Sequence, residues 1–328
     1  MEMLHIKKRS FIICIISFIC IIVFILLIII LKTQKYVVFN VDKKYISIFS
    51  SKDSEYIVMT SNKGITDIYN SDCKFKKSIE TGNVKDISMY ENELLYIKAD
   101  GTVWVNKLSD DCNKRQITTI QNAVSCSACE YHYGVVTQEG KAYIWADFPN
   151  SPTELDGIKN AKKIVCNFKN TVILTADGKV YYIEHTNQNT LIDDENITYK
   201  QILKESNIKD ISANSDSVIA VSDNGNKILT YNFRNNNFSE FKLNSKIIDI
   251  KASSKHYSAL TENGDVYIWK YLYGLSPEKM KYSSQPEKMK SISKVESIYP
   301  VNNGYTFAFK DKKLYRVCKK RSIFDISK

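Results

Sequence analysis

The residues whose types and spacing are best suited to metal chemistry are Cys126, Cys129 and His132. The two cysteines are separated by two residues, and the histidine follows three positions later. Thiolate and imidazole ligands at this spacing are typical of half of a structural zinc site, but such a site needs a second pair of ligands at a suitable distance. The sequence offers no second pair, and Cys126 occupies a strand position that is apolar elsewhere in the chain. We therefore predict no metal and no other cofactor.

A second histidine, His256, has surroundings that resemble those of His132. The two stretches read "EYHYGVVTQEGKAYIW" and "SKHYSALTENGDVYIW", and they end in Trp145 and Trp269. A ligand site would require the two histidines to converge. Repetition of the whole stretch instead favours a structural role, in which each histidine closes a bend within its own repeat. The two tryptophans are predicted to pack within the fold rather than to form a stacking platform.

Other chemical motifs are weak. The acidic run Asp193–Glu195 lacks the regular aspartate spacing of a calcium loop and is typical of a solvated loop. The sequence contains no glycine-rich phosphate loop, nucleophile elbow or paired His–Glu helix motif. It leaves open an active site made of Asp, Glu, Tyr and Lys side chains on one face of the fold.

The element that carries His256 is a β-hairpin that recurs along the chain. Asn263 and Gly264 lie between two segments that alternate apolar and polar residues, which is a strong hairpin signal because the turn requires positive φ. The same pattern recurs six more times, with spacings of 37, 39, 38, 47, 39 and 48 residues between turn positions. The turn positions are Gly64, Gly101, Gly140, Gly178, Gly225, Gly264 and, without glycine, Lys312.

Each copy also has an earlier strand. An apolar residue recurs 14 positions before the turn position, and a second one recurs 17 positions before it. The first set is Ile87, Cys126, Ile164, Ile211, Ile250 and Ile298, and the second is Val84, Ala123, Ala161, Ile208, Ile247 and Val295. The repeating unit is therefore a strand, a tight bend and a hairpin.

Seven units of about 40 residues, made only of short strands, predict an all-β fold: a seven-bladed β-propeller. Neighbouring blades bury each other's faces, and closure of the ring protects the edges of the sheets. The propeller is predicted to span residues 45–328. Either Tyr36–Val41 or Arg321–Ile326 is able to complete the last blade, and the sequence does not decide between them.

The repeat resembles that of the regulator of chromosome condensation family. In Ile247–Trp269 an apolar strand, a small-residue bend, a histidine before an apolar run, a turn ending in glycine and a final Trp follow one another in the family's order. His256 and Trp269 match the family's histidine and tryptophan, and His132 and Trp145 match them in the third unit. The resemblance covers about residues 45–318 and implies a seven-bladed propeller.

The chain departs from the family at the end of this repeat. Ala146 and Lys270 replace the glycine that follows the tryptophan, and Tyr271–Ser276 is at best a remnant of the glycine-rich loop. Nucleotide exchange and chromatin binding belong to nuclear members, so neither these nor nucleic-acid binding is expected here. Secreted bacterial relatives of the fold include inhibitors that bind an enzyme through one propeller face. The resemblance therefore implies a protein partner.

An apolar segment precedes the propeller. Phe11–Leu31 contains 21 residues without a charge, enough for a helix to cross a bilayer core of about 30 Å. Basic residues precede it at positions 7–9, and no cleavage pattern follows, which favours an uncleaved signal anchor. We expect a cytosolic tail over residues 1–10, a transmembrane helix over 11–31, a linker with a possible closing strand over 32–44, and the propeller outside the cytosol.

The charge and cysteine content add little to this assignment. The chain of 328 residues has a net charge of +10, but its lysines are spread along the sequence. This is typical of a solvated surface, and attraction to an anionic cell-wall polymer remains an alternative. Six cysteines lie outside the apolar segment, at positions 73, 112, 126, 129, 166 and 318, without the dense spacing of a disulfide scaffold.

A short duplication lies between the sixth and seventh units. The sequence Pro-Glu-Lys-Met-Lys occurs at 277–281 and again at 286–290. It is predicted to be a surface loop, and because binding residues concentrate on loops it is also a candidate contact loop. The residues concerned are Pro277, Lys279, Lys281, Pro286, Lys288 and Lys290.

Together these features predict a membrane-anchored, extracytoplasmic β-propeller that acts as a protein-recognition module. The alternatives are an envelope enzyme that acts on a polysaccharide or a peptide, and a binder of anionic cell-wall polymer. The enzyme would need two or three acidic or tyrosine side chains that converge near the central channel.

Overall fold

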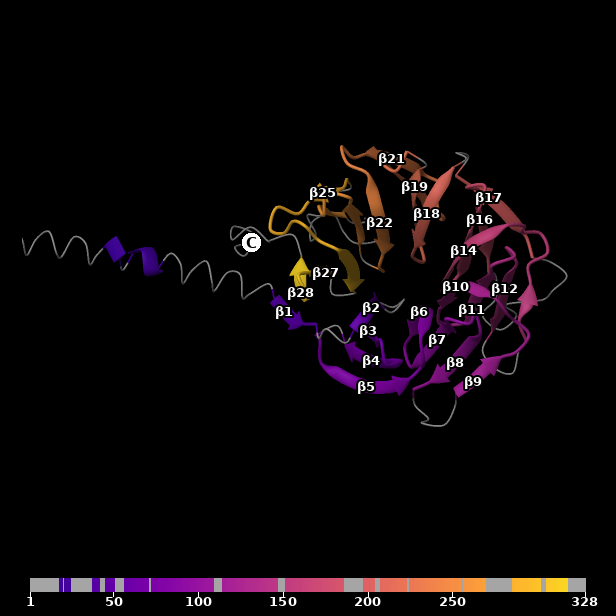
Figure 1. Ribbon diagram of the computed structural model, residues 1–328. Coiled ribbons are helices and arrows are strands. Elements are labelled where there is room, and N and C mark those ends of the chain that lie inside the picture. The colour runs from indigo at the N-terminus through magenta and orange to yellow at the C-terminus, as the bar shows by residue number, and fades with distance from the viewer. Residues whose placement is uncertain are drawn as a thin grey trace, which may run out of the picture.

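The computed structural model is a ring of seven four-stranded antiparallel sheets, the blades of a β-propeller (Figure 1). The predicted all-β, seven-bladed fold is therefore confirmed. The structure describes residues 18–19, 21–24, 37–41, 45–50, 56–70, 72–108, 114–146, 151–185, 197–203, 207–222, 224–254, 256–269, 285–301 and 305–317.

Within these residues each blade has a fourth, outer strand, which the repeat pattern did not predict for the first six blades. The strands of the first four blades are β2 (Tyr45–Ser50), β3 (Tyr56–Ser61), β4 (Ile65–Asn70), β5 (Phe75–Glu80); β6 (Val84–Tyr90), β7 (Glu93–Lys98), β8 (Val103–Lys107), β9 (Lys114–Ile117); β10 (Ala123–Ala128), β11 (His132–Thr137), β12 (Ala142–Ala146), β13 (Thr153–Glu154); and β14 (Ala161–Asn167), β15 (Asn170–Thr175), β16 (Val180–Glu184), β17 (Tyr199–Ile202). Those of the last three are β18 (Ile208–Ala213), β19 (Ser217–Ser222), β20 (Lys227–Asn232), β21 (Phe238–Lys242); β22 (Ile247–Ala252), β23 (Tyr257–Thr261), β24 (Val266–Trp269), β25 (Glu287–Lys288); and β26 (Ser297–Val301), β27 (Tyr305–Lys310), β28 (Lys313–Val317) with β1 (Val37–Asn40).

The hydrophobic core lies between the blades. The second strands β11, β15 and β19 are buried along their whole length, whereas the outer strands β5 and β21 are largely exposed. Leu95 of β7 and Val135 of β11 belong to one buried cluster, although they come from different blades. Full burial of such a side chain stabilises the fold by about 1.5–3 kcal/mol, so each blade depends on its neighbours.

The turn glycines do more than supply positive φ. Gly178 has a φ of +79°, and a Cβ atom there would lie 2.5 Å from the backbone N and Cα of Asn207, which leads into the next blade. The Gly178 carbonyl oxygen accepts a hydrogen bond from the Ile208 amide at 3.2 Å. The same carbonyl-to-next-blade bond recurs at Gly64, Gly101, Gly140, Gly225 and Gly264. Each glycine turn therefore joins two blades.

The ring is closed by the N-terminal strand. β1 pairs with β28 in antiparallel register, with Phe39 opposite Leu314. The Val41 amide donates to the Lys312 carbonyl oxygen at 2.9 Å, which reproduces in the seventh blade the bond made by the turn glycines. β1 and β28 lie side by side in Figure 1. The other proposed closing segment, Arg321–Ile326, lies outside the described residues.

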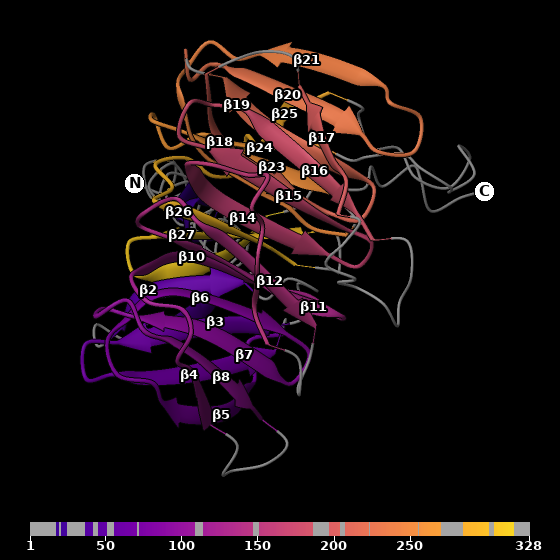
Figure 2. The same ribbon diagram turned by 90° about the vertical axis from the view of Figure 1, so that its right-hand side faces the viewer.

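Consecutive strands run in opposite directions, so the two ends of the blades differ. The bends between first and second strands, such as those after β6, β10, β14, β18 and β22, form one face, here called the bend face. The turns at the repeated glycines lie at the other ends of the same strands and form the glycine face. The outer strands β5 and β21 lie at opposite sides of the ring (Figure 1, Figure 2).

The predicted transmembrane segment is described only at residues 18–19 and 21–24, which are helical. Their six apolar side chains are 42–66% exposed. Among the residues that the structure describes, no helix is both long and apolar enough to cross a membrane. Most of Phe11–Leu31, and the ten residues predicted to form a cytosolic tail before it, lie outside the described residues.

Candidate functional site

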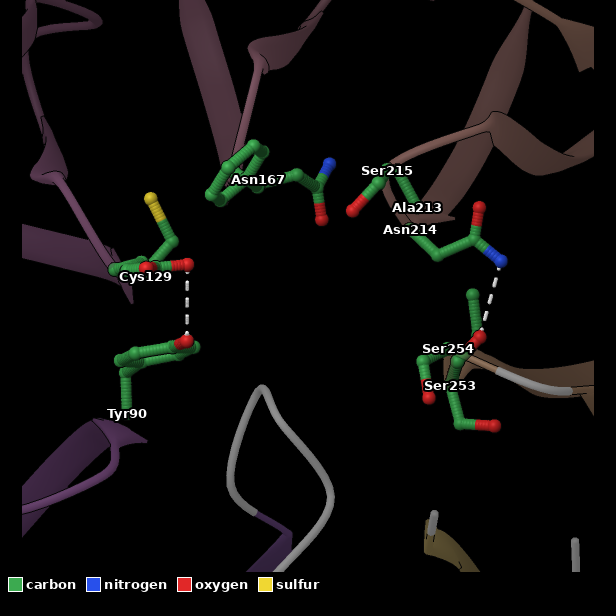
Figure 3. A pocket seen from close by; sticks show the side chains of 11 residues that line it. Tyr90, Cys129, Asn167, Ala213, Asn214, Ser215, Ser253 and Ser254 are labelled. Carbon is green, nitrogen blue, oxygen red and sulfur yellow. Dashed lines mark hydrogen bonds between the residues drawn. The ribbon is translucent and has the colours of Figure 1, made fainter. Parts of the chain in front are cut away.

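A pocket of about 260 Å³ opens on the bend face, at the mouth of the central channel (Figure 3). Its walls come from the ends of five first strands and the bends that follow them. The lining residues are Tyr90 of the second blade, Cys129 and Glu130 of the third, Asn167 and Phe168 of the fourth, Ala213, Asn214 and Ser215 of the fifth, and Ala252, Ser253 and Ser254 of the sixth. Five blades converge here, so this is the candidate functional site.

The amide side chains of the pocket hold its walls together. The Asn214 carbonyl oxygen accepts hydrogen bonds from the amides of Asp216 and Ser217, both at 3.0 Å, and so closes its bend. Its amide nitrogen donates to the Ser253 carbonyl oxygen in the next blade at 3.0 Å, a bond visible in Figure 3. With its amide in the favoured orientation, Asn167 donates in the same way to Ala213 at 3.1 Å. These amides therefore fix the positions of neighbouring bends.

The first sequence-predicted histidine, His132, lies beneath this wall. Its Nδ1 atom lies 3.1 Å from the Cys129 sulfur at the end of its own bend. Its Nε2 atom lies 2.7 Å from the Thr171 hydroxyl in the next blade, and that hydroxyl lies 3.0 Å from Nε2 of His185. The threonine has one proton to donate, so it donates to one imidazole and accepts from the other.

The electrostatics of this cluster oppose thiol activation. Burial lowers the pKa of His132 well below its usual value, and the neighbouring His185 lowers it further. Burial also lowers the pKa of His185 to about 4. Both imidazoles are neutral near pH 7, and a weakly basic His132 does not draw the proton from Cys129. The contact therefore stabilises the bend.

The sixth blade repeats this arrangement with serine in place of cysteine. The Ser253 hydroxyl lies 3.0 Å from Nδ1 of His256, whose Nε2 lies 2.9 Å from the Thr306 hydroxyl of the seventh blade. The next residue, Tyr257, contacts the preceding blade, because its hydroxyl forms a hydrogen bond with Ser217 of the fifth blade. Each histidine contacts its own bend, which agrees with the structural role expected from the repetition. Each also contacts a threonine of the following blade, and the sequence analysis did not anticipate this second contact.

The two repeated tryptophans lie in the core between blades. Trp145 is fully buried and Trp269 is 2% exposed. Each packs against the tyrosine that follows the repeated histidine, with ring centroids 5.3 Å apart for Tyr133 and Trp145 and 5.5 Å apart for Tyr257 and Trp269. Neither ring faces the pocket.

Charged side chains meet in the channel below the pocket. Lys163 forms an ion pair with Asp210 at 2.6 Å, and Lys251 forms one with Asp249 at 3.1 Å. Burial raises the pKa of Asp86; two backbone N–H bonds and the charges of Lys163 and Lys251 oppose this shift. Because those lysines belong to the fourth and sixth blades, the groups must interact across the channel. The carboxylates of Asp210 and Asp249 are paired with lysines, and that of Asp86 accepts backbone N–H bonds. These interactions stabilise the charged carboxylates and so oppose a role as general acid or base.

A further set of contacts joins the first strands. The Ser88 hydroxyl accepts a hydrogen bond from the Ala128 amide, Ser127 accepts from Cys166, and Ser212 accepts from Ala252, each at 2.9 Å. These serines stand 13 positions before a turn glycine in three units. That recurrence is a sequence signal that could have found them.

The cysteines and the acidic run are the remaining residues that the sequence offered as possible ligands. No group of three His, Cys, Asp or Glu side chains among the described residues is arranged to hold a metal ion. Among the described residues, Cys73, Cys126, Cys129 and Cys166 are not joined in disulfide bonds. Cys112 and Cys318 lie outside the described residues, as does the Asp193–Glu195 run.

The second copy of the duplicated motif includes a short strand, which corrects its prediction as a surface loop. Glu287 and Lys288 form β25, the outer strand of the sixth blade, and Met289 is buried against the seventh. Lys288 forms an ion pair with Asp265 at 2.6 Å. The loop signal failed here because β25 is too short to show a strand pattern. Pro286 and Lys290 flank this strand, while Pro277, Lys279 and Lys281 lie outside the described residues.

The rim of the pocket beside the third blade carries the side chains best placed to contact a ligand. Glu130 is exposed and is the acidic residue among those that line the pocket. The Tyr90 hydroxyl donates to its Oε2 atom at 3.2 Å across the blade boundary. The Phe168 ring lies at the same rim, packed against Tyr131 with centroids 5.0 Å apart.

Solved structures share this architecture, although no protein-family model and no curated protein matches the chain. Prp20p of Saccharomyces cerevisiae, the yeast RCC1, has a TM-score of 0.57 and 14% identity over 87% of this chain and 84% of its own. Hsv2 of Kluyveromyces lactis has a TM-score of 0.60 and 13% identity over 85% and 98%. Human WBSCR16 has a TM-score of 0.55 and 14% identity over 75% and 85%.

The likeness shows the fold alone. At this identity it supports the predicted resemblance to the regulator of chromosome condensation family as a shared seven-bladed architecture. It does not carry over a site, because function resides in particular side chains rather than in the fold.

Proposed function

We propose that this protein is a recognition module that binds a protein partner through the bend face of its propeller. The observation that carries the proposal is the pocket itself, which is built from five blades and framed by hydrogen bonds between them. A rigid scaffold of this kind holds a binding surface in place at small entropic cost on association.

The solved structures of similar fold are consistent with a protein partner. Prp20p binds Gsp1p and histones, and it has also been solved in complex with Kap60. Another similar structure, the WD40 repeats of RRP9, is a propeller with a TM-score of 0.58. The identity of the partner does not follow from these examples, since the sequences are 14% identical or less.

We further propose that the chain is anchored in a membrane by Phe11–Leu31, with the propeller outside the cytosol. The support is the uncharged length of the segment and the basic residues before it. The described apolar side chains from Phe18 to Phe24 are about half exposed, which fits insertion into lipid better than contact with water. A protease-protection experiment on intact cells tests this: a tag after residue 328 should be cleaved, and a tag before residue 1 should be protected.

The main alternative is an envelope enzyme that acts on a polysaccharide or a peptide. The observation that favours it is the meeting of Asp86, Asp210 and Asp249 in the channel. The lysine pairs and the backbone bonds described above oppose it, because paired carboxylates are poor general acids and bases. A third hypothesis is that the protein binds an anionic cell-wall polymer, and its support is the net charge of +10.

Capture of ligands by the full-length chain in detergent distinguishes these readings. A detergent extract and a washed wall fraction are applied at low salt and at about 1 M salt, where the Debye length is about 3 Å. Retention of one protein at high salt supports a recognition module. Retention of wall alone, only at low salt, favours the polymer reading, and release of sugar or peptide products favours the enzyme.

A further inference from the structure

We infer that the pocket receives the cationic side chain of a lysine or arginine residue presented by the protein partner. This inference rests on the proposed function and deepens it, because it names the chemistry of the group that enters the site. It follows from an inventory of the lining side chains and of the bonds that each already makes.

Three neutral polar side chains of the pocket, Asn214, Asn167 and Ser253, already make hydrogen bonds within the propeller. Asn214 uses its carbonyl oxygen and its amide nitrogen in three hydrogen bonds to backbone atoms. The Asn167 amide donates a hydrogen bond to the Ala213 carbonyl oxygen, and the Ser253 hydroxyl contacts His256. A sugar or another neutral polar ligand would have to replace these bonds, so the pocket is poorly suited to it.

Glu130 has acceptor capacity that the propeller does not use up. A carboxylate offers about four lone-pair sites. Tyr90 donates to Oε2 at 3.2 Å, and a side-chain hydrogen bond to Glu130 also raises the pKa of the neighbouring Tyr131 hydroxyl. The Tyr90 phenol orients the carboxylate, which keeps lone pairs for a charged donor. A lysine ammonium or an arginine guanidinium satisfies them with charge-assisted bonds.

Aromatic rings flank this carboxylate. Tyr90 and Phe168 line the pocket on either side of the third-blade bend, and Tyr131 packs against Phe168. Ring faces attract cations through their quadrupole. The Lys169 ammonium already lies 5.7 Å from the Phe168 ring centroid, so one face of this ring has an ammonium close to it within the chain.

The size of the pocket fits a single side chain. Its volume of about 260 Å³ lies below the roughly 300–1,000 Å³ of pockets that hold drug-sized ligands. The chain as a whole is basic, which opposes approach of a cation at long range. At physiological salt such repulsion is screened beyond about 8 Å, whereas a contact with Glu130 is short-ranged.

A direct test uses small probes on the full-length chain in detergent. Nα-acetyl-lysinamide and Nα-acetyl-argininamide are compared with Nα-acetyl-leucinamide and Nα-acetyl-glutaminamide by saturation-transfer NMR. The inference predicts that the two cationic probes are saturated most strongly at the side-chain methylenes next to the charge. Equal saturation of the neutral and cationic probes would overturn it.

Two substitutions assign the signal to the pocket. Glu130→Gln keeps the shape of the side chain and removes its charge, and it should weaken binding of the lysine probe at least tenfold. Glu139→Gln is the matched control, because Glu139 is an exposed carboxylate at the β11–β12 turn on the glycine face. Unchanged affinity in Glu130→Gln, or equal loss in both variants, would contradict the inference.

The outcomes also separate the inference from the proposed function. If the partner is retained equally by wild type and Glu130→Gln, and the probes bind without preference, the recognition function stands and the inference fails. If the probes require Glu130 but no protein is captured, the cation site stands and the protein-partner proposal fails.

Discussion

The Nε2 atom of His132 in the third blade lies 2.7 Å from the Thr171 hydroxyl in the fourth, across the boundary between two sheets. The residue that follows, Tyr133, donates its hydroxyl to Glu93 of the second blade. Two consecutive residues thus join one blade to both of its neighbours. His256 and Tyr257 repeat the arrangement in the sixth blade. These side chains secure the bend face on which the candidate pocket is built.

The His256–Thr306 contact predicts a measurable coupling energy. His256→Ala should reduce the free energy of unfolding by about 1–3 kcal/mol, because it leaves the fully buried Thr306 hydroxyl without this partner. In a double-mutant cycle with Thr306→Val, measured by urea unfolding and tryptophan fluorescence, we expect a coupling of roughly 1 kcal/mol. The same histidine substitution combined with Thr171→Val, which contacts His132 instead, should be additive.

The neutral histidines predict a loss of stability in acid. His185 has a pKa of about 4 in the folded protein, below the value of 6.5 for an unperturbed histidine. Between these pH values the unfolded chain binds one more proton, so stability falls as pH decreases, by about 1.4 kcal/mol per pH unit from this group. Urea unfolding from pH 7 to pH 4.5 should show a shallower slope in His185→Asn. An unchanged slope would mean that folding does not lower the pKa of His185.

The glycine turns predict a difference between two glycines with similar φ. Gly178→Ala should be strongly destabilising, because the new Cβ would lie 2.5 Å from backbone atoms of Asn207. Gly82 has a φ of +74°, but its Cβ would meet only Lys98 Cε at 3.7 Å, so Gly82→Ala should cost about 1–2 kcal/mol. Urea unfolding of both variants tests this. Equal losses would show that the close approach to the next blade does not matter.

The seventh turn predicts a stabilising substitution. Lys312 has a φ of +60° and is exposed, so it carries the conformational cost of the left-handed region. Lys312→Gly removes that cost, and after allowance for the greater freedom of the unfolded chain it should raise the free energy of unfolding by about 0.5–1 kcal/mol. Lys312→Ala keeps the unfavourable φ and should be close to wild type in the same unfolding assay.

Much of the fold could be predicted from the sequence, because the repeated unit is local. The turn glycines and the apolar residues before them follow the backbone directly, and seven copies imply a ring. The outer strands of the first six blades were missed, whereas the closing strand β1 lies within the proposed segment Tyr36–Val41. β13 and β25 are two residues long, so they show no alternation of apolar and polar residues, and β25 was taken for a loop.

The candidate site was not predicted, because its members are brought together only by the circular arrangement of the blades. Tyr90 and Glu130 are 40 positions apart in sequence, yet their side chains form a hydrogen bond. Asn214 and Ser253 are 39 positions apart and bridge two blades. No pattern within one repeat indicates such pairs. They become visible only when the same position is compared from unit to unit.

The measurement that tests the central claim most directly is partner capture at about 1 M salt with two matched substitutions. Ser215→Arg places a large side chain at the pocket on the bend face, and Asn62→Arg places the same side chain on an exposed turn of the glycine face. Our account predicts that Asn62→Arg retains the partner as wild type does, while Ser215→Arg loses it and melts at the same temperature. Retention by Ser215→Arg, or loss in Asn62→Arg alone, would contradict recognition through the bend face.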